Sequence, residues 1–381
     1  MHRSPGVRAG LAALIAFVMV VAVACSADDA DDAAGGSSGG SADATTETTG
    51  GGNATGELVS TDWQKVLAPP SCHCSDGSPF HYWVRRGDPG KVLFYLEGGG
   101  ACFSAETCAS DTATYTVNIE GDGGPGDGGI FDLENDENPL ADHSMIYVPY
   151  CTGDLHLGDA VTDYSDDVTV HHNGYTNAST ALAAAGALFP DATEVVVAGS
   201  SAGSAGAPGF GGGAHDVWPD ADVAVIADGS AAYPGTPEIT LTIGGLWGVD
   251  EGIPLWPETA DLPAEAWSLH GLFTNSATHF PEIRFASFND AYDEVQAAFA
   301  ALIGLDGSNL VDLIDDTNES ISDTGVDLST WVSPGTEHTI LGKPDLYDEE
   351  VDGQRFVEWL TDFLAGDDVD DVHCDDCEPP A

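Results

Sequence analysis

Ser201 stands at the centre of residues 199–203 (GSSAG), which fit the pattern G-x-S-x-G. The preceding residues 194–198 (EVVVA) are almost continuously apolar, as is typical of a strand buried on both faces. Where such a strand turns sharply into a helix, the turn exposes the central serine, and small neighbours let the backbone close. This context favours a nucleophilic serine over a flexible Ser/Gly turn. Ser200 and Ser204 lie off the centre of the pattern and are weaker candidates.

A serine that attacks a carbonyl also needs donors for the oxyanion, usually backbone N–H groups. Three glycines at residues 98–100 follow another apolar stretch, residues 91–96. Glycine lets the backbone approach a ligand closely, so we expect N–H groups of Gly99 and Gly100 to contribute, together with that of Ala202. A tight turn is the alternative interpretation of the glycines.

The segments that must position these residues alternate between strands and helices. Continuous apolar runs predict buried strands, whereas an Ala-rich stretch and apolar residues at helical spacing predict helices. The predicted strands are residues 91–96, 145–149, 194–198, 222–227 and 283–288, and the predicted helices are residues 176–189, residues 295–299 and a last helix marked by Phe356, Leu360 and Phe363. This order predicts an α/β fold with a doubly wound, mostly parallel sheet in a single catalytic domain.

An acid and a histidine follow the serine in the order that such a sheet requires. In hydrolases of this type the acid follows a late strand, and the histidine lies in a loop before the final helix. Asp293 comes just after the strand at residues 283–288, and His338 lies ahead of the last helix. Asp290 is an alternative acid. His156 could line the pocket, and a surface role for it is equally open.

Four blocks of this sequence resemble the pectin acetylesterase and Notum group of secreted, α/β-hydrolase-like carboxylesterases. The blocks are residues 96–102 (LEGGGAC), 150–154 (YCTGD) with 158–159 (GD), 199–203 (GSSAG) and 291–296 (AYDEVQ). They occur in family order over most of the chain after Cys72. Ala101 and Thr152 depart from the plant members, so the sequence is more similar to the bacterial branch. The resemblance implies Asp293 as the acid.

The predicted chemistry is acyl transfer. His338 takes the proton of Ser201 while Asp293 orients the imidazole ring, and water then releases the acid from an acyl-enzyme. The resemblance to acetylesterases, and the lack of a Met- or Phe-rich lid, predict that acetyl or other short acyl groups are removed from a small molecule or polysaccharide. No metal or organic cofactor is needed. A serine amidase or peptidase on the same fold and a non-catalytic, surface-binding lipoprotein are the alternatives.

The charge of the chain excludes several partners. Only 9 basic residues stand against 64 acidic ones, for a net charge of −55, so nucleic acids, heparin-like polymers and anionic membrane surfaces are poor partners. The acidic residues are dispersed along the chain, and acidic side chains spread over a folded surface hold water and cations in high salt, so we expect a saline habitat. Residues 121–129 have the Asp and Gly content of a calcium loop but not its spacing, and a surface loop is the favoured interpretation.

The N-terminal residues predict export. Arg3 and Arg8 precede an apolar run that ends in small residues before Cys25, so residues 1–24 are predicted to be a lipoprotein signal peptide. Lipidation of Cys25 would make a lipid anchor to the cell envelope the only membrane contact, and cleavage without lipidation is the alternative. Residues 25–57 lack aromatic residues and predict a disordered, acidic Gly/Ser/Thr linker, followed by the esterase domain at residues 58–381.

Seven further cysteines follow, and in an exported protein they favour disulfides. Cys102 and Cys108 are close in sequence and form a natural pair. The remaining candidates form two clusters at the ends of the domain, Cys72 with Cys74 and Cys374 with Cys377. We expect disulfides between these clusters to tie the two ends together, with one cysteine left unpaired. A zinc site built from the two clusters is the alternative.

Overall fold

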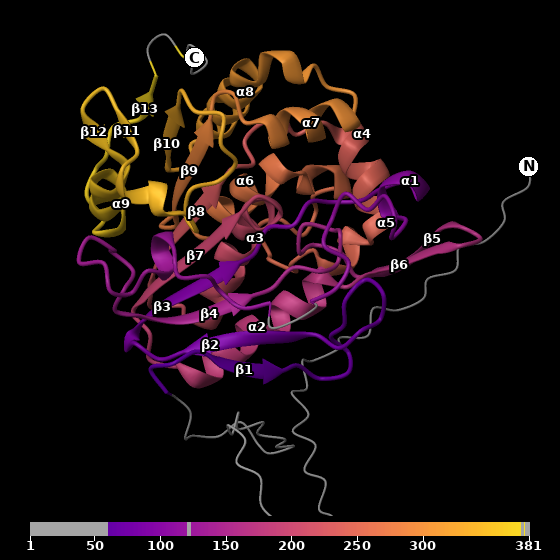
Figure 1. Cartoon of the computed structure of the whole chain (residues 1–381), viewed down its shortest axis with the longest axis horizontal. Coiled ribbons are helices and arrows are strands. Elements are labelled where there is room, and N and C mark those ends of the chain that lie inside the picture. The colour runs from indigo at the N-terminus through magenta and orange to yellow at the C-terminus, as the bar shows by residue number, and fades with distance from the viewer. Residues whose placement is uncertain (1–59, 120–122, 375–376, 378–381) are drawn as a thin grey trace, which may run out of the picture. The chain divides into compact units, whose positions relative to one another are not determined.

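The computed structural model describes residues 60–119, 123–374 and 377 (Figure 1). The predicted signal peptide at residues 1–24, Cys25 and the linker at residues 25–57 lie outside the described residues. None of the described helices combines the length and the apolar character needed to cross a membrane.

A nine-stranded sheet forms the centre of the described part of the chain, in the order β1-β2-β4-β3-β7-β8-β9-β10-β13. Its strands are β1 (Gln64–Leu67), β2 (His81–Arg85), β3 (Asp88–Leu96), β4 (His143–Val148), β7 (Glu194–Ser200), β8 (Asp222–Asp228), β9 (Arg284–Asp290), β10 (Leu328–Ser333) and β13 (Val372–His373). All neighbours from β4 to β13 pair in parallel, whereas β1 and β2 form an antiparallel edge. The prediction of a mostly parallel, doubly wound sheet is confirmed.

Helices cover both faces of this sheet. Alternate residues of β3 and β7 point to opposite faces, as the pleat requires. One face packs against α2 (Gly174–Leu188), α3 (Ala202–Val217) and α6 (Leu269–His279), and the other packs against α9 (Phe356–Leu364). The predicted helix at residues 176–189 is α2, and the predicted last helix is α9. The residues at 295–299 belong to α7 (Glu294–Leu302).

The remaining elements are short or lie outside the sheet. They are α1 (Ala105–Cys108), α4 (Pro237–Ile239), α5 (Gly245–Trp247), α8 (Leu310–Ser322), the π-helix η2 (Thr240–Gly244), the 3₁₀ turns η1 (Gly129–Phe131), η3 (Val249–Gly252), η4 (Ala264–Trp267), η5 (Gly307–Asn309) and η6 (Pro344–Tyr347), and the hairpins β5 (Ala160–Ser165) with β6 (Val168–His172) and β11 (Glu350–Val351) with β12 (Gln354–Arg355). The β5–β6 hairpin projects from the body of the molecule (Figure 1).

The disulfides differ in part from the prediction. Cys102 pairs with Cys108 as expected. The other two bonds join Cys74 to Cys151 and Cys374 to Cys377, and Cys72 is a buried free thiol. The prediction that the terminal clusters tie the two ends of the domain together is therefore wrong, although one cysteine is unpaired as expected. The reason is topological, because the two clusters flank strands at opposite edges of the sheet, β2 and β13.

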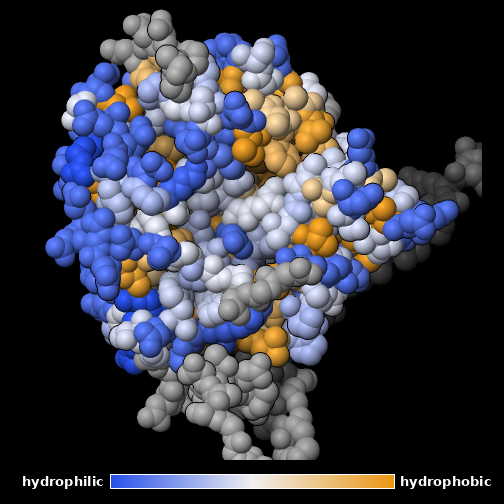
Figure 2. All heavy atoms as spheres, in the orientation of Figure 1, coloured by the Kyte–Doolittle hydropathy of each residue, from blue (hydrophilic) through white to orange (hydrophobic). Residues whose placement is uncertain are grey.

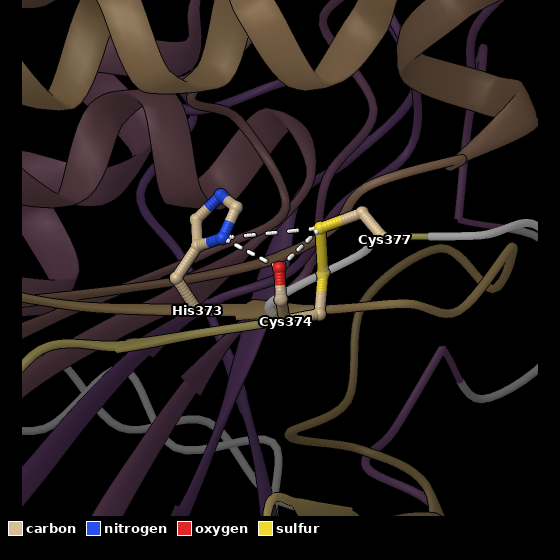
Figure 3. A group of neighbouring side chains, drawn as sticks. All are labelled: His373, Cys374 and Cys377. Carbon is tan, nitrogen blue, oxygen red and sulfur yellow. Dashed lines mark hydrogen bonds between the residues drawn. A yellow bond between two sulfur atoms is a disulfide. The ribbon is translucent and has the colours of Figure 1, made fainter.

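The alternative of a zinc site rested on histidine and cysteine side chains that do lie close together at one end of the domain, at residues 373–377. The donor atoms of His373, Cys374 and Cys377 lie within 4.8 Å of one another. Figure 3 shows that the two sulfur atoms are bonded to each other, while Nδ1 of His373 faces the Cys374 carbonyl at 2.9 Å. A disulfide supplies no thiolate ligand.

Candidate active site

Ser201 occupies a sharp bend between β7 and α3. Its backbone angles are φ 55° and ψ −117°, a conformation that residues other than glycine rarely adopt. The Ser201 N–H donates to the carbonyl of Asp228 at 2.8 Å. A Cβ atom at Gly203 would collide with the Leu96 carbonyl, and one at Gly199 would collide with the backbone of Gly203. The two glycines of the motif are therefore required for the bend to close.

Asp293 and His338 form a hydrogen-bonded pair. Oδ2 of Asp293 lies 2.6 Å from Nδ1 of His338. The same carboxylate caps α7, since Oδ1 accepts from the N–H groups of Val295 at 2.9 Å and Gln296 at 3.0 Å. The Asp293 side chain is 1% exposed, so these donors fix the carboxylate in a site shielded from water.

Asp290, the alternative acid, faces other groups. It ends β9, and its carboxyl group contacts the Ser333 hydroxyl and the backbone of Glu337. Burial raises the pKa of Asp290 to about 7. The structure thus brings Asp293, and not Asp290, to the imidazole of His338.

The second ring nitrogen of His338 is available. Within the described residues, Nε2 of His338 has no hydrogen-bond partner and is buried. The ring lies beside Gly229, where an added Cβ would be 3.5 Å from Cε1 of His338, and Gly229 lines the same cavity as Ser201. The ring of the Asp-oriented imidazole therefore lies next to a residue of the cavity that Ser201 also lines.

The glycine loop at residues 98–100 lies against the serine. A Cβ at Gly98 would be 2.8 Å from Cβ of Ser201, and Gly100 has a φ of 78°, which favours glycine. Gly100 and Ala202 both line the cavity. Among the described residues, the N–H groups of Gly99, Gly100 and Ala202 donate no hydrogen bond outside regular secondary structure, which leaves them available to an oxyanion.

A buried aspartate that the sequence analysis missed joins the serine bend to the histidine loop. Oδ2 of Asp228 accepts from the Ser200 hydroxyl at 2.5 Å and from the Leu341 N–H at 3.0 Å, and Oδ1 accepts from the Ile340 N–H at 2.9 Å. Burial raises the pKa of Asp228. The available signal was an aspartate at the end of an apolar strand, the same placement that marks Ser201.

Gln296 links the carboxylate of Asp293 to neighbouring segments through a second set of hydrogen bonds. Its amide nitrogen donates to Oδ2 of Asp293 at 3.0 Å and to Oδ1 of Asn289 at 3.1 Å, while its Oε1 accepts from the Ala232 N–H at 3.0 Å. The network ties α7 to the loop that follows β8, where the cavity begins.

An apolar cavity of about 130 Å³ opens beside Ser201. One side of its lining comes from the glycine loop and from residues 155 and 157. The rest comes from several residues between 229 and 249, from η4 and the start of α6, and from Phe299 and Ile303. Figure 2 shows hydrophobic surface gathered over the region where Figure 1 labels α4 and α7. Leu302 of α7 and Leu241 of η2 have exposed side chains. This cavity is larger than an acetyl group requires. No single Met- or Phe-rich run of the sequence marks this cavity, because its apolar lining comes from separate segments.

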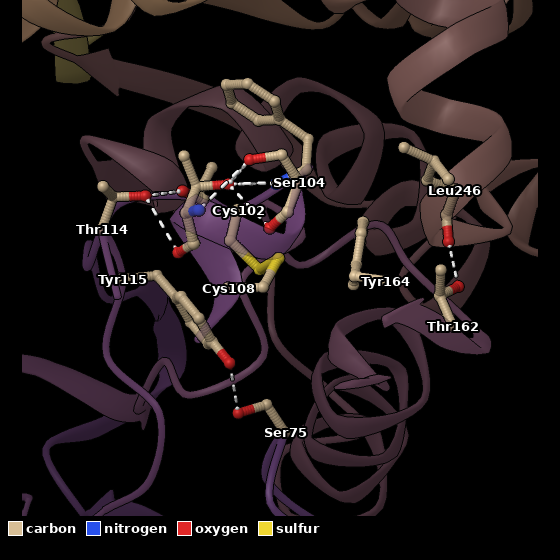
Figure 4. The surroundings of a disulfide bond; sticks show 12 residues. Ser75, Cys102, Ser104, Cys108, Thr114, Tyr115, Thr162, Tyr164 and Leu246 are labelled. Carbon is tan, nitrogen blue, oxygen red and sulfur yellow. Dashed lines mark hydrogen bonds between the residues drawn. A yellow bond between two sulfur atoms is a disulfide. The ribbon is translucent and has the colours of Figure 1, made fainter. Parts of the chain in front are cut away.

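The Cys102–Cys108 disulfide stabilises one side of the cavity. Ala101 and Phe103, which flank Cys102, line it. The Cys102 N–H donates to the Gly153 carbonyl at 3.0 Å, and the Cys102 carbonyl accepts from Nε1 of Trp247 at 2.7 Å. Figure 4 shows the disulfide among neighbouring segments, with Thr162 of the projecting hairpin bonded to the Leu246 carbonyl.

His156 does not line this cavity. It is 1% exposed, and Nε2 lies 2.9 Å from the carbonyl of Glu97. Burial lowers the pKa of His156 to about 4. Its position indicates that it anchors the loop after Tyr150.

Comparisons with known proteins agree on one family. The model of the pectinacetylesterase family matches residues 60–230. The inactive palmitoleoyl-protein carboxylesterase notum1b of Danio rerio is 32% identical over 100 residues, which cover 25% of this chain and 71% of that protein. The palmitoleoyl-protein carboxylesterase NOTUM of Mus musculus is 32% identical over 98 residues, or 24% of this chain, and the match spans only 20% of its length.

A solved structure shares the fold. The structure of the Wnt deacylase Notum from Drosophila superposes with a TM-score of 0.62 over 83% of this chain and 96% of the other, at 18% sequence identity. The likeness extends well beyond the part that the sequence comparisons align.

Proposed function

Because this chain belongs to the pectinacetylesterase and Notum family, we propose that it is a serine carboxylesterase whose nucleophile is Ser201. The observation that carries the proposal is the pairing of Nδ1 of His338 with Asp293, which leaves Nε2 without a partner among the described residues, in a ring that lies next to Gly229 of the Ser201 cavity. An imidazole held in this tautomer accepts a proton from a serine.

The proposed reaction uses each group in turn. Nε2 of His338 accepts the Ser201 proton as Oγ attacks the ester carbonyl, and Asp293 stabilises the imidazolium. N–H groups of Gly99, Gly100 and Ala202 bind the oxyanion. His338 returns the proton to the leaving alcohol, and water that His338 activates then hydrolyses the acyl-enzyme. None of these steps calls for a cofactor.

The cavity indicates the acyl group. A cavity of about 150 Å³ with an apolar lining holds a benzene molecule, so the space beside Ser201 suits an acyl group of up to about six carbons. The short acyl groups expected from the sequence fall in this range, and acetyl is its lower end.

The charge of the protein bears on the acyl carrier. A net charge of −55 repels polyanions, so we propose a neutral acylated small molecule or polysaccharide in place of acidic pectin. The disulfides support export to an oxidising compartment, in which lipidation of Cys25 would anchor the chain to the cell envelope. Incorporation of labelled palmitate into the wild type, and not into Cys25→Ser, would test the anchor.

A fluorophosphonate probe tests the nucleophile. The wild type and the Ser204→Ala variant should be labelled, whereas Ser201→Ala should lose labelling and on the order of 10⁴-fold or more of its kcat on 4-nitrophenyl butanoate. Labelling that persists in Ser201→Ala would assign the nucleophile elsewhere. Faster hydrolysis of a butanoyl anilide than of the ester would favour the alternative function of a serine amidase or peptidase. A wild type that is neither labelled nor active would favour a non-catalytic, surface-binding lipoprotein.

A further inference from the structure

The cavity beside Ser201 has a neighbour on its far side. A second cleft of about 600 Å³ is lined mainly by apolar residues of α2, α3 and the segment at residues 249–257. Three residues line both spaces, namely Leu157, Val249 and Trp267. We call these three residues the partition. Each of the three residues therefore faces the first cavity and the second cleft.

The partition is part of a small apolar cluster that is separate from the two cores of the sheet. Leu157 and Trp267 are buried in it together with Trp256 and Leu272, and Val249 packs against them. The rings of Trp256 and Trp267 lie 5.8 Å apart. Because neither main core contributes to the cluster, its side chains can be reduced in size without opening the interior of the sheet.

The backbone that carries Leu157 is held firmly. Leu155 and His156, just before it, have φ angles of 60° and 61°, and the loop is tied by Asp154, whose Oδ2 accepts from the Gly174 N–H at 2.8 Å. The Tyr150 hydroxyl also accepts from the Leu155 N–H at 2.9 Å. These hydrogen bonds hold the backbone at Leu157 in place, so an acyl chain that contacts Leu157 meets a rigid segment of the protein.

The other two partition residues act through their bulk. Val249 follows Gly248, whose φ of 69° turns the chain at the start of η3. Among the described residues, Nε1 of Trp267 is buried without a hydrogen-bond partner, so no polar contact is lost when the side chain moves or shrinks.

We propose that the partition sets the upper limit on the length of the acyl group that this protein accepts. The inference rests on the proposed function, since it assumes that the acyl group of the ester enters the cavity beside Ser201. We expect an acyl chain that outgrows about 130 Å³ to meet Leu157, Val249 or Trp267, beyond which the second cleft lies. The substrate class is thus esters of short and medium acyl groups, with long fatty acyl groups excluded.

The test is a chain-length series on a protein whose partition has been opened. The kcat/KM of the wild type on 4-nitrophenyl esters from acetyl to dodecanoyl should fall steeply beyond hexanoyl or octanoyl. In the double variant Leu157→Ala with Val249→Ala, the kcat/KM on the dodecanoyl ester, relative to butanoyl, should rise at least about tenfold, because a single methylene in an apolar pocket changes kcat/KM about 10- to 200-fold.

Two matched controls separate the partition from the spaces on either side. Leu269 lines only the first cavity, and Ile253 lines only the second cleft. Leu269→Ala should lengthen the accepted chain by about one or two carbons only, and Ile253→Ala should leave the limit at its wild-type length. A dodecanoyl gain as large in Ile253→Ala as in the double variant would overturn the proposal.

Two other results of the chain-length series would also count against the partition as the limit on acyl length. A folded double variant with the wild-type limit, or a wild type that already prefers dodecanoyl, would overturn the inference. If the double variant does not melt cooperatively, the single variants Leu157→Ala and Val249→Ala take its place. Calorimetric titration with alkanoic acids from butanoic to dodecanoic acid reads the same limit without turnover, so the inference remains testable even if no ester is hydrolysed and the proposed function fails.

Discussion

Nδ1 of His338 lies 2.6 Å from Oδ2 of Asp293, although 45 positions separate the two residues in the chain. Asp290, only three positions before Asp293, is turned instead to Ser333 in the neighbouring strand. The two carboxyl groups are therefore predicted to have different roles, which substitution by asparagine can separate.

Asp293→Asn should lower kcat by about 10⁴-fold, because an amide no longer holds the imidazole in the tautomer that accepts a proton. Asp290→Asn should lower kcat by less than about tenfold, since its carboxyl group does not contact His338. Steady-state hydrolysis of 4-nitrophenyl butanoate measures both, with circular dichroism as the control for folding. A larger loss in a folded Asp290→Asn would reverse the assignment of the acid.

Asp290 should also make stability depend on pH. Burial raises its pKa from 3.8 to about 7, so the folded state holds this proton more tightly than the unfolded state. The stabilisation is fully present below pH 3.8 and is lost as the pH rises to about 7. Asp290→Asn stays neutral, so it should melt higher than the wild type at about pH 8, with the difference shrinking towards pH 4. A difference in melting temperature that is equal at both pH values would contradict this.

Asp228→Asn should weaken both the fold and catalysis. An amide –NH₂ in place of one carboxylate oxygen would face the N–H of Leu341 or Ile340, and an unsatisfied buried donor costs about 1–3 kcal/mol. Because the loop after His338 depends on these bonds, we expect kcat to fall about tenfold or more with little change in KM. Asp222→Asn is the matched control, because Asp222 lies at the other end of β8 and its exposed carboxylate pairs with Arg284. Equal kcat values for the two variants would exclude a positioning role for Asp228.

The melting temperature should rise with salt. Repulsion among 64 acidic residues destabilises the compact state, and the Debye length shrinks from about 30 Å at 0.01 M to about 3 Å at 1 M salt. Scanning calorimetry in 0.05 to 2 M NaCl measures the effect, with sucrose at matched water activity as the control. Maximal stability at low salt would show that the charges are already compensated locally.

The sequence predicted the elements whose pattern is local. The strands around the serine and α2 have continuous apolar runs or Ala-rich stretches, and they appear within a few residues of the predicted bounds. Two-residue β13 has no such pattern, and α6 and β10 are too polar or too short to stand out. These elements depend on tertiary contacts, which override weak local preferences.

Part of the candidate site could likewise be predicted from the sequence. The order along the chain predicted His338 and an acid near the end of β9, and the resemblance of residues 291–296 to the family favoured Asp293 over Asp290; the structure brings Asp293 and His338 together. Asp228 and the partition were missed, since each acts through contacts between segments far apart in sequence. The disulfide between the ends was wrong for the same reason, because strand order is decided by pairing and not by proximity along the chain.

The bend at Ser201 has a consequence for how the sequence can change. A φ of 55° with a ψ of −117° costs a non-glycine residue about 1–3 kcal/mol, which the contacts of β7 and α3 must offset. Ser201→Gly would relieve that strain, so it should melt above Ser201→Ala, and differential scanning calorimetry of the two would show it. The most stable residue at this position is thus one without an oxygen. Natural selection for a durable fold alone would erase the nucleophile, and only selection for its chemistry would keep a serine there.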